Sequence, residues 1–115
     1  MRINTEILDE GQVAAISFRG DNLDASNAKL FKDAVQPLLE SHQTIMFDMS
    51  GLNFVDSTGL GSLLSCLRTM NNKEGQLILF AMNKPVQALF ELVRMHRIFS
   101  IYATKEDALA SLQSN

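Results

Sequence analysis

The chain has 115 residues, 46% hydrophobic and 20% charged, and ten Lys and Arg against thirteen Asp and Glu leave a formal net charge of −3. This is the length of one domain, which is expected to span residues 1–115. Folding would bury roughly two-thirds of the surface of the unfolded chain, enough for a hydrophobic core that needs no disulfide or metal ion to stabilise it. The composition argues against intrinsic disorder, and the acidic balance argues against nucleic acid or an anionic membrane surface as a partner.

The first part of the chain predicts a hairpin, a helix and a strand. Apolar and polar residues alternate over residues 3–7 and an apolar run resumes at 13–18, so two antiparallel strands are expected there. Apolar residues spaced three and four positions apart then mark one face of a helix: Phe31, Ala34, Val35, Leu38 and Leu39. Pro37 is expected late in this helix or at a kink in it. The apolar run at 44–49 predicts a short buried strand.

The second part alternates helices with strands. The best helical stripe of the chain consists of Leu60, Leu63, Leu64, Leu67 and Met70. Residues 77–81 predict a buried strand, and Pro85 suits the start of the next helix because its missing N–H would be unpaired there. Residues 98–102 predict a short last strand, and Thr104 opens a capping-box-like start to a last helix. The expected fold class is therefore α/β, a mixed sheet with an antiparallel hairpin, parallel βαβ units and about four helices.

Other features of the sequence favour a cytoplasmic protein without metal or cofactor. The N-terminus is polar, and the longest apolar run, Leu77 to Met82, is too short to span a membrane. The single Cys66 has no intrachain partner, and no Cys and His residues have the spacing of a zinc site. His42 and His96 form no nucleophile and base arrangement with other residues, so structural or surface roles are expected for both, and Cys66 is expected to be a buried structural thiol.

One junction between a strand and a helix gathers the residues that could carry a function. The leucine-bearing helix is expected to begin at or just after Asp56, Ser57 and Thr58. A helix N-terminus presents free N–H groups and the positive end of the dipole, so a phosphate is well tolerated there. Gly59 and Gly61 each lose roughly 0.8–1 kcal/mol of helix propensity relative to alanine. Their small size therefore indicates tight packing on the sheet or the close approach of a partner.

Two interpretations of this junction stay open from the residues alone. Ser, Thr and Asp are the commonest N-caps and each stabilises a helix by about 1 kcal/mol, so capping by itself would account for them. A modified hydroxyl at a binding surface would account for them equally well.

An enzyme is the rival from another class. The chain has no Gly-Lys-Ser/Thr phosphate loop, and Gly59 to Leu64 lacks the third glycine of a dinucleotide site. A receiver-like domain would use Asp48 as the phosphoacceptor, but its acidic pair and its lysine are not convincingly placed. A protein-binding module is therefore favoured over a receiver-like or nucleotide-handling domain, and steady turnover by the purified protein would reverse that preference.

The sequence resembles a known family at residues 54–64, which read Phe54-Val55-Asp56-Ser57-Thr58-Gly59-Leu60-Gly61-Ser62-Leu63-Leu64. This segment looks like the signature of STAS domains, specifically the stand-alone bacterial anti-sigma factor antagonists. The opening hairpin, the turn after Gly20 and residues 84–92 match the family in order and spacing. Residues 93–98 depart from it, because they are bulky and basic where the family usually has a small or glycine-containing turn.

The resemblance implies a partner-switching module. Ser57, or less favourably Thr58, would be phosphorylated by a serine-protein kinase of the GHKL type that often doubles as the anti-sigma factor, and a PP2C-type phosphatase would reverse the modification. The unmodified protein would bind this partner and phosphorylation would release it. A scaffold subunit of a signalling complex, independent of phosphorylation and with Ser57 only a cap, is the alternative.

The resemblance also implies which residues bind the partner. Asp24 matches an acidic position of the family near the phosphorylated serine, and its alternative role is a turn aspartate that caps the next helix. Asp56 matches the acid of the motif, and its alternative role is that of a helix-start acid. The implied partner-binding residues are Asp24, Asp56, Ser57, Thr58, Gly59, Leu60, Gly61 and Ser62.

Overall fold

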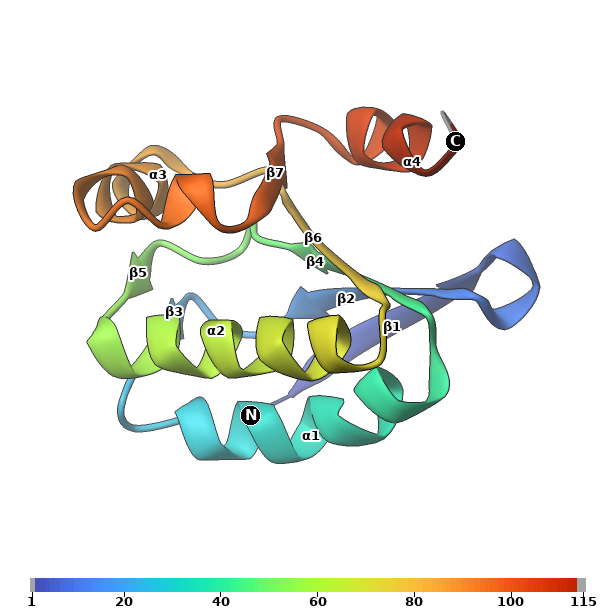
Figure 1. Cartoon of the computed structure of the whole chain (residues 1–115). Coiled ribbons are helices and arrows are strands. Elements are labelled where there is room, and N and C mark those ends of the chain that lie inside the picture. The colour runs from blue at the N-terminus through green and yellow to red at the C-terminus, as the bar shows by residue number, and fades with distance from the viewer. Residues whose placement is uncertain (1, 114–115) are drawn as a thin grey trace.

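The computed structural model describes residues 2–113 and contains a five-stranded mixed sheet, shown with its helices in Figure 1. The strands follow the order β1-β2-β4-β6-β7, with bounds β1 Ile3–Leu8, β2 Val13–Phe18, β4 Thr44–Asp48, β6 Gln76–Phe80 and β7 Ser100–Tyr102. β1 is antiparallel to β2, and all other neighbours are parallel. The mixed sheet with its opening hairpin confirms the fold class expected from the sequence.

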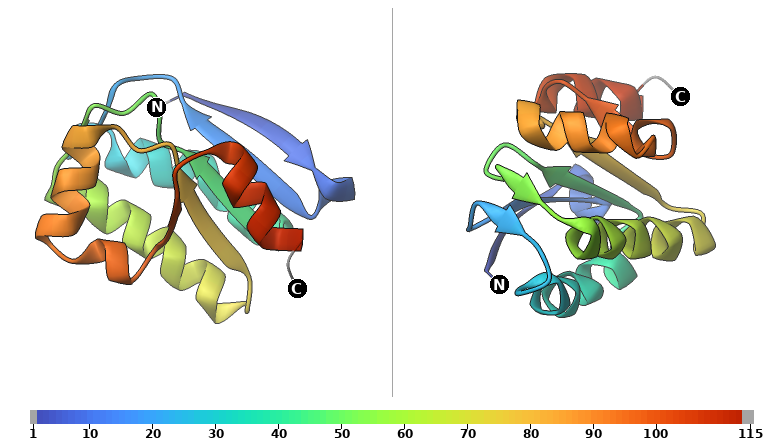
Figure 2. Two further views of the ribbon diagram at one scale, coloured as in Figure 1. Left: turned by 90° about the horizontal axis from the view of Figure 1, so that it is seen from above. Right: turned by 90° about the vertical axis from the view of Figure 1, so that its left-hand side faces the viewer.

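Four α-helices occur in the described part of the chain: α1 Ala28–Ser41, α2 Ser57–Asn72, α3 Lys84–Leu92 and α4 Lys105–Gln113. From β2 onward each new parallel strand is added next to the previous one, always on the same side of the sheet. Because the connections between parallel strands are right-handed, the helices that connect these strands lie on one face of the sheet. α1 and α2 lie side by side on that face, as the views in Figures 1 and 2 show. α4 follows the last strand and covers part of the opposite face.

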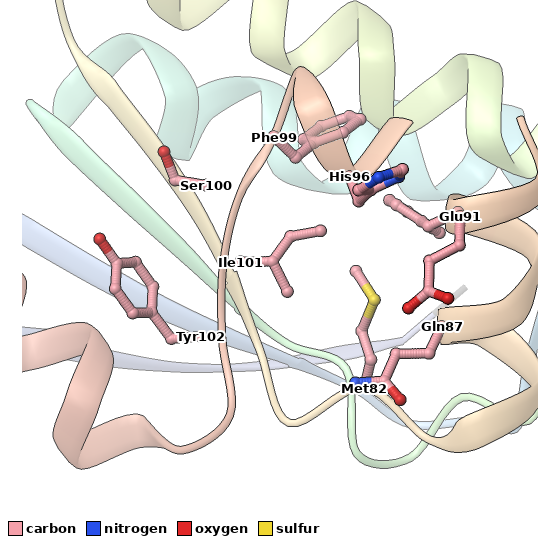
Figure 3. Close-up of a pocket in the computed structure, with 9 residues that line it drawn as sticks. Met82, Gln87, Glu91, His96, Phe99, Ser100, Ile101 and Tyr102 are labelled. Carbon is pink, nitrogen blue, oxygen red and sulfur yellow. The ribbon is translucent and has the colours of Figure 1, made fainter. Parts of the chain in front are cut away.

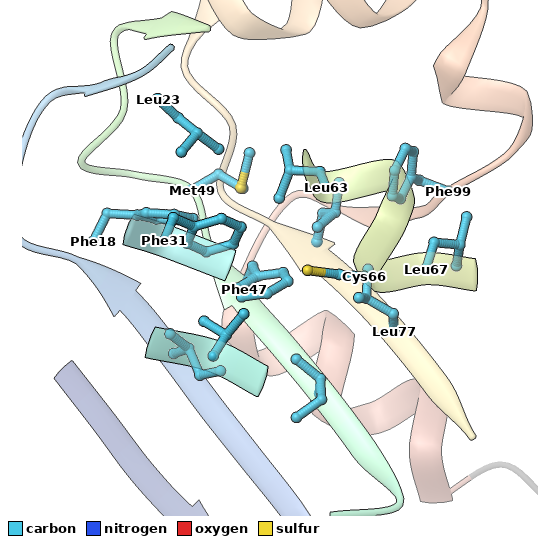
Figure 4. Close-up of a cluster of buried hydrophobic side chains, with 14 of the residues drawn as sticks. Phe18, Leu23, Phe31, Phe47, Met49, Leu63, Cys66, Leu67, Leu77 and Phe99 are labelled. Atoms are coloured by element: carbon cyan, nitrogen blue, oxygen red, sulfur yellow. The ribbon is translucent and has the colours of Figure 1, made fainter. Parts of the chain in front are cut away.

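Successive residues of a strand supply two different cores, as the period of two in a strand requires. Ile45 and Phe47 point toward α1 and α2, whereas Met46 between them contributes to the smaller core under α4. The larger core is shown in Figure 4, where the rings of Phe18, Phe31 and Phe47 lie with their centroids 5.3 to 5.8 Å apart. The inner face of α2 is thus packed along its whole length, and this packing holds the start of the helix in place.

Cys66 lies in this larger core, which confirms the expectation of a buried thiol. Burial disfavours the thiolate and raises the pKa of Cys66 to about 12. The thiol is therefore protonated at neutral pH and fills space like a small apolar side chain.

Pro37 lies late in α1, as expected, and the helix continues to Ser41, whose hydroxyl donates to the Pro37 carbonyl at 2.7 Å. The last strand begins at Ser100 rather than at residue 98, because Met95–Arg97 form a 3-10 turn, η2. Arg94 precedes that turn with φ 62°, the left-handed conformation that glycine adopts without strain. The bulky segment 93–98 thus makes the turn that a glycine would make more easily.

Two short strands were not expected from the sequence. β3, Asn22–Leu23, and β5, Phe54–Val55, form a separate parallel ladder with Asn22 opposite Phe54 and Leu23 opposite Val55. Strands of two residues have no measurable periodicity, so the pattern gave no sign of them. No described helix has the length and apolarity needed to cross a membrane.

Candidate functional site

The N-terminus of α2 lies beside the β3 and β5 ladder at one end of the molecule, the end that faces the viewer in the right-hand view of Figure 2. Backbone hydrogen bonds fix this arrangement. The N–H groups of Asn53 and Phe54 donate to the Asp21 carbonyl at 2.8 and 3.3 Å, and the Asp56 N–H donates to the Leu23 carbonyl at 3.3 Å. The loop before α1 therefore holds the loop before α2 in place.

Asn83 holds the same loop from its other side. Its side-chain amide donates to the carbonyls of Ser50 and Leu52 at 2.9 and 3.0 Å, and to the side-chain oxygen of Asn53 at 3.0 Å. Because Asn83 precedes α3, the approach to α2 is tied to the start of the next helix as well. The segment that leads into the candidate site is held in one conformation.

Asp56 is the N-cap of α2. One oxygen of its carboxylate accepts from the Gly59 N–H at 2.8 Å, and the other accepts from the Ala25 N–H at 3.1 Å. The same side chain therefore caps the helix and binds the loop that carries Asp24. This confirms the role of Asp56 as a helix-start acid, and it assigns the cap to Asp56 rather than to Ser57.

Asp24 lies in this loop and is held as an anion. Its carboxylate accepts from the hydroxyl and, at 2.9 Å, the N–H of Ser26, and from the side-chain amide of Asn22 at 2.7 Å. The hydroxyl of Ser26, then its N–H, then the Asn22 amide lower the pKa of Asp24 below its usual value, because all three donate to the charged form. Asp24 is thus a turn aspartate, but it does not cap α1 as its alternative role supposed, because Asn27 is the residue before the first turn of that helix. The role of Asp24 in partner binding stays a prediction.

Ser57 and Thr58 are the first two residues of α2, and both are exposed. Within residues 2–113 neither hydroxyl forms a hydrogen bond, and the two backbone N–H groups have no acceptor. The interpretation of Ser57 as only a cap is therefore wrong. Modification of either hydroxyl would break no contact, and the free N–H groups of the first turn would face the added group.

Gly59 and Gly61 have different environments although they are two residues apart. A Cβ atom on Gly59 would lie 2.1 Å from the carbonyl oxygen of Leu23, so α2 approaches β3 as closely as it does only because residue 59 is glycine. A Cβ atom on Gly61 would have no heavy atom within 4 Å, and Gly61 is exposed. Tight packing explains Gly59 and leaves Gly61 unexplained by the fold.

The remaining residues of the motif face inward to different degrees. Ser62 is buried and its hydroxyl donates to the Gly59 carbonyl at 2.6 Å, while Leu60 is half-buried against the larger core. Gly59 and Ser62 are therefore buried within the start of the helix, where a partner on the surface would not contact them. The residues of the predicted set that are exposed or half-exposed are Asp24, Asp56, Ser57, Thr58, Leu60 and Gly61.

The structure adds Phe54 to this surface, a residue that the sequence placed in the motif without a role. Phe54 is 54% exposed, whereas Val55 is 5% exposed. The only sequence signal was the short apolar pair before Asp56, which does not reveal which of its members faces inward.

A pocket of about 450 Å³ lies elsewhere, between α3, η2 and β7. Figure 3 shows its lining, which includes His96, Glu91 and Tyr102 around the apolar side chains of Met82 and Ile101. None of its lining residues belongs to the set predicted from the sequence. Among the described residues no three His, Cys, Asp or Glu side chains are grouped as metal ligands would be.

The sheet also decides against the receiver-like alternative. A receiver has an all-parallel sheet of order 2-1-3-4-5, with a reversal of strand order beside the site. Here the parallel strands follow one another in a single direction behind an antiparallel edge strand. Asp48 ends β4, and its carboxylate accepts from the Ser50 N–H at 2.9 Å, the contact of a turn aspartate.

Comparison with known proteins gives consistent results. The family model for the STAS domain matches residues 4–108. The anti-sigma F factor antagonist of Paenibacillus polymyxa is 25% identical over 115 residues, which cover 98% of this chain and 97% of that protein.

Among solved structures, a proposed anti-sigma factor antagonist of Thermotoga maritima has a TM-score of 0.88 and 26% identity over 96% of this chain and 94% of that one. The Bacillus protein SpoIIAA in its phosphorylated form has a TM-score of 0.72 and 19% identity over 96% of this chain and 99% of that one.

Proposed function

Because the chain belongs to the STAS domain family, we propose that it is an anti-sigma factor antagonist, a protein-binding module of signal transduction and transcription regulation rather than an enzyme. Relatives that match nearly the whole chain carry that name, which supports an anti-sigma factor as its partner. The proposal treats residues 1–115 as one such module that acts in the cytoplasm, without a nucleic acid or membrane partner.

The observation that carries the mechanism is the free hydroxyl of Ser57 at the start of a packed helix. In the proposal the unmodified surface around Ser57 binds a GHKL-type serine-protein kinase that is also the anti-sigma factor. Phosphorylation of Ser57 adds about 1.5 to 2 negative charges at pH 7. In the complex this charge would be buried at the interface without a partner of opposite charge, so phosphorylation separates the two proteins. A PP2C-type phosphatase then removes the phosphoryl group and restores binding.

The fold itself tolerates the phosphoryl group. The unpaired N–H groups of Ser57 and Thr58 and the positive end of the helix dipole both favour a negative charge at this point. The hydrogen bonds of the Asp24 and Asp56 carboxylates hold the loop before α1 and join it to the start of α2, and none of them involves the Ser57 hydroxyl, so phosphorylation breaks none of them. The modification is therefore expected to change binding and leave folding intact.

We expect the kinase to label Ser57 rather than Thr58. Phosphopeptide mapping after incubation with the cognate kinase and ATP measures this directly. Ser57→Ala should abolish the label, whereas Thr58→Val should keep it. A label on Thr58 alone would contradict the assignment, and tight binding of the kinase with no label on either residue would favour the scaffold subunit instead.

Gly61→Ala should raise the free energy of unfolding by roughly 0.8–1 kcal/mol and yet weaken the complex with the anti-sigma factor. The added methyl group meets open space in this protein, so only the gain in helix propensity remains. At a contact surface the same methyl group would hold the partner away from α2. Chemical unfolding and calorimetric titration measure the two effects, with Asn72→Ala at the far end of α2 as the control. Unchanged affinity would remove Gly61 from the binding surface.

A further inference from the structure

Phe54 is the exception among the phenylalanines of this chain. Six of the seven are at most 8% exposed: Phe18, Phe31, Phe47, Phe80, Phe90 and Phe99. Phe54 is 54% exposed. An aromatic ring on the surface leaves a large apolar area in contact with water, so its position on the molecule is informative.

The ring is exposed because the backbone places it there, not because the segment is loose. β5 pairs with β3, so Phe54 and Val55 must point to opposite sides of the ladder, and Val55 takes the inward side. The Phe54 N–H donates to Asp21, and the next residue but one caps α2 through Asp56. A fixed backbone therefore holds the ring three residues before Ser57.

From this position we propose that Phe54 is the apolar anchor of the surface that binds the anti-sigma factor, inserting its ring into an apolar pocket of the partner beside Ser57; this inference rests on the proposed function. Aromatic residues in pockets at the centre of an interface dominate binding energy. A ring with a pre-set backbone loses little conformational freedom when it is buried, which favours it as an anchor.

The anchor would also increase the effect of phosphorylation. Burial of an aromatic ring excludes water from its surroundings, and a charge in a region without water is poorly solvated. A phosphoryl group on Ser57 would then lie at the margin of that region and lose part of its hydration in the complex. Burial of the Phe54 ring and phosphorylation of Ser57 therefore oppose each other in the complex.

The test compares Phe54→Ala with Ile7→Ala. Ile7 is 49% exposed and pairs with Ala14 near the start of β2, whereas α2 begins beyond the opposite ends of the parallel strands. The control therefore removes a similarly exposed apolar side chain far from the start of α2. Calorimetric titration against the purified cognate anti-sigma factor should show binding about tenfold weaker or worse for Phe54→Ala and within about twofold of wild type for Ile7→Ala. Phe54→Leu, which keeps an apolar side chain, should recover most of the affinity.

The possible outcomes distinguish an error in the role of Phe54 from an error in the proposed function. If wild type binds the anti-sigma factor, is released by phosphorylation, and Phe54→Ala binds equally well, the anchor is wrong and the proposed function stands. If the wild-type protein does not bind the anti-sigma factor at all, the proposed function itself is wrong. If thermal melts show that Phe54→Ala loses affinity only in proportion to lost folded protein, the ring is structural and the inference is overturned.

Discussion

Ser57→Asp is expected to fold like the wild-type protein and to bind its anti-sigma factor at least roughly tenfold more weakly. The cap of α2 is Asp56, so residue 57 contributes no hydrogen bond to the helix start that aspartate would remove. An acid in the first turn is favoured by the helix dipole. In the complex, however, the added carboxylate is an unpaired charge at the interface, which costs about 2–5 kcal/mol. Aspartate carries less charge than a phosphoryl group, so the kinase itself should have the larger effect.

Ser57→Ala is the matched control for this substitution. Because Ser57 is not the cap, alanine should leave the free energy of unfolding nearly unchanged, keep the affinity for the partner, and remove the response to the kinase. Calorimetric titration of both variants, with thermal melts to verify folding, measures these effects. A folded Ser57→Asp protein that binds like wild type would eliminate the switch.

Gly59→Ala is expected to lower the free energy of unfolding by about 1–3 kcal/mol, the loss typical of an overpacked core. The new methyl group would lie 2.1 Å from the carbonyl oxygen and 2.7 Å from the carbonyl carbon of Leu23, and both atoms belong to backbone that cannot rotate away. α2 or β3 must therefore move. That movement would also break the contact of Asp56 with the loop of Asp24, so binding of the partner should fall with stability.

Gly61→Ala provides the comparison for that loss. Both substitutions add one methyl group to the same helix, and both gain the same helix propensity, so the difference between them isolates the clash with Leu23. Urea unfolding of the two variants should place their midpoints on opposite sides of wild type. A Gly59→Ala protein as stable as Gly61→Ala would show that β3 adjusts freely and that the close approach is not required.

The main elements could be predicted from the sequence because each carries a long and consistent pattern. The leucine stripe of α2 repeats over several turns, and β4 and β6 are continuous apolar runs bounded by polar residues. The segment that carries the site could be predicted for a related reason. Gly59 and Gly61 lie near the start of a helix, where glycine is unfavourable, and this marks the segment as unusual. Patterns of this kind are local, and local patterns are what a single sequence contains.

The roles within the site could not be predicted, because they depend on distant neighbours. Asp56, Ser57 and Thr58 are all good caps, and only the position of the first helical turn selects Asp56. Gly59 and Gly61 are the same residue, yet one faces the Leu23 carbonyl and the other faces solvent. The exposure of Phe54 could not be predicted because β5 has only two residues and both of them, one inward and one outward, are apolar.

The ladder between β3 and β5 also determines when the site comes into existence during folding. Its strands meet only after the chain has closed a loop that contains the whole of α1, and the contact between Ala25 and Asp56 spans 31 residues. Closing such a loop costs conformational entropy before any contact repays it, so contacts of this kind form late. An isolated peptide of residues 54–64 would carry every residue of the motif, but it would lack the ladder, the cap contact with the first loop and the fixed ring. A partner that recognises this surface therefore distinguishes the folded loops around the start of α2 from an unfolded chain.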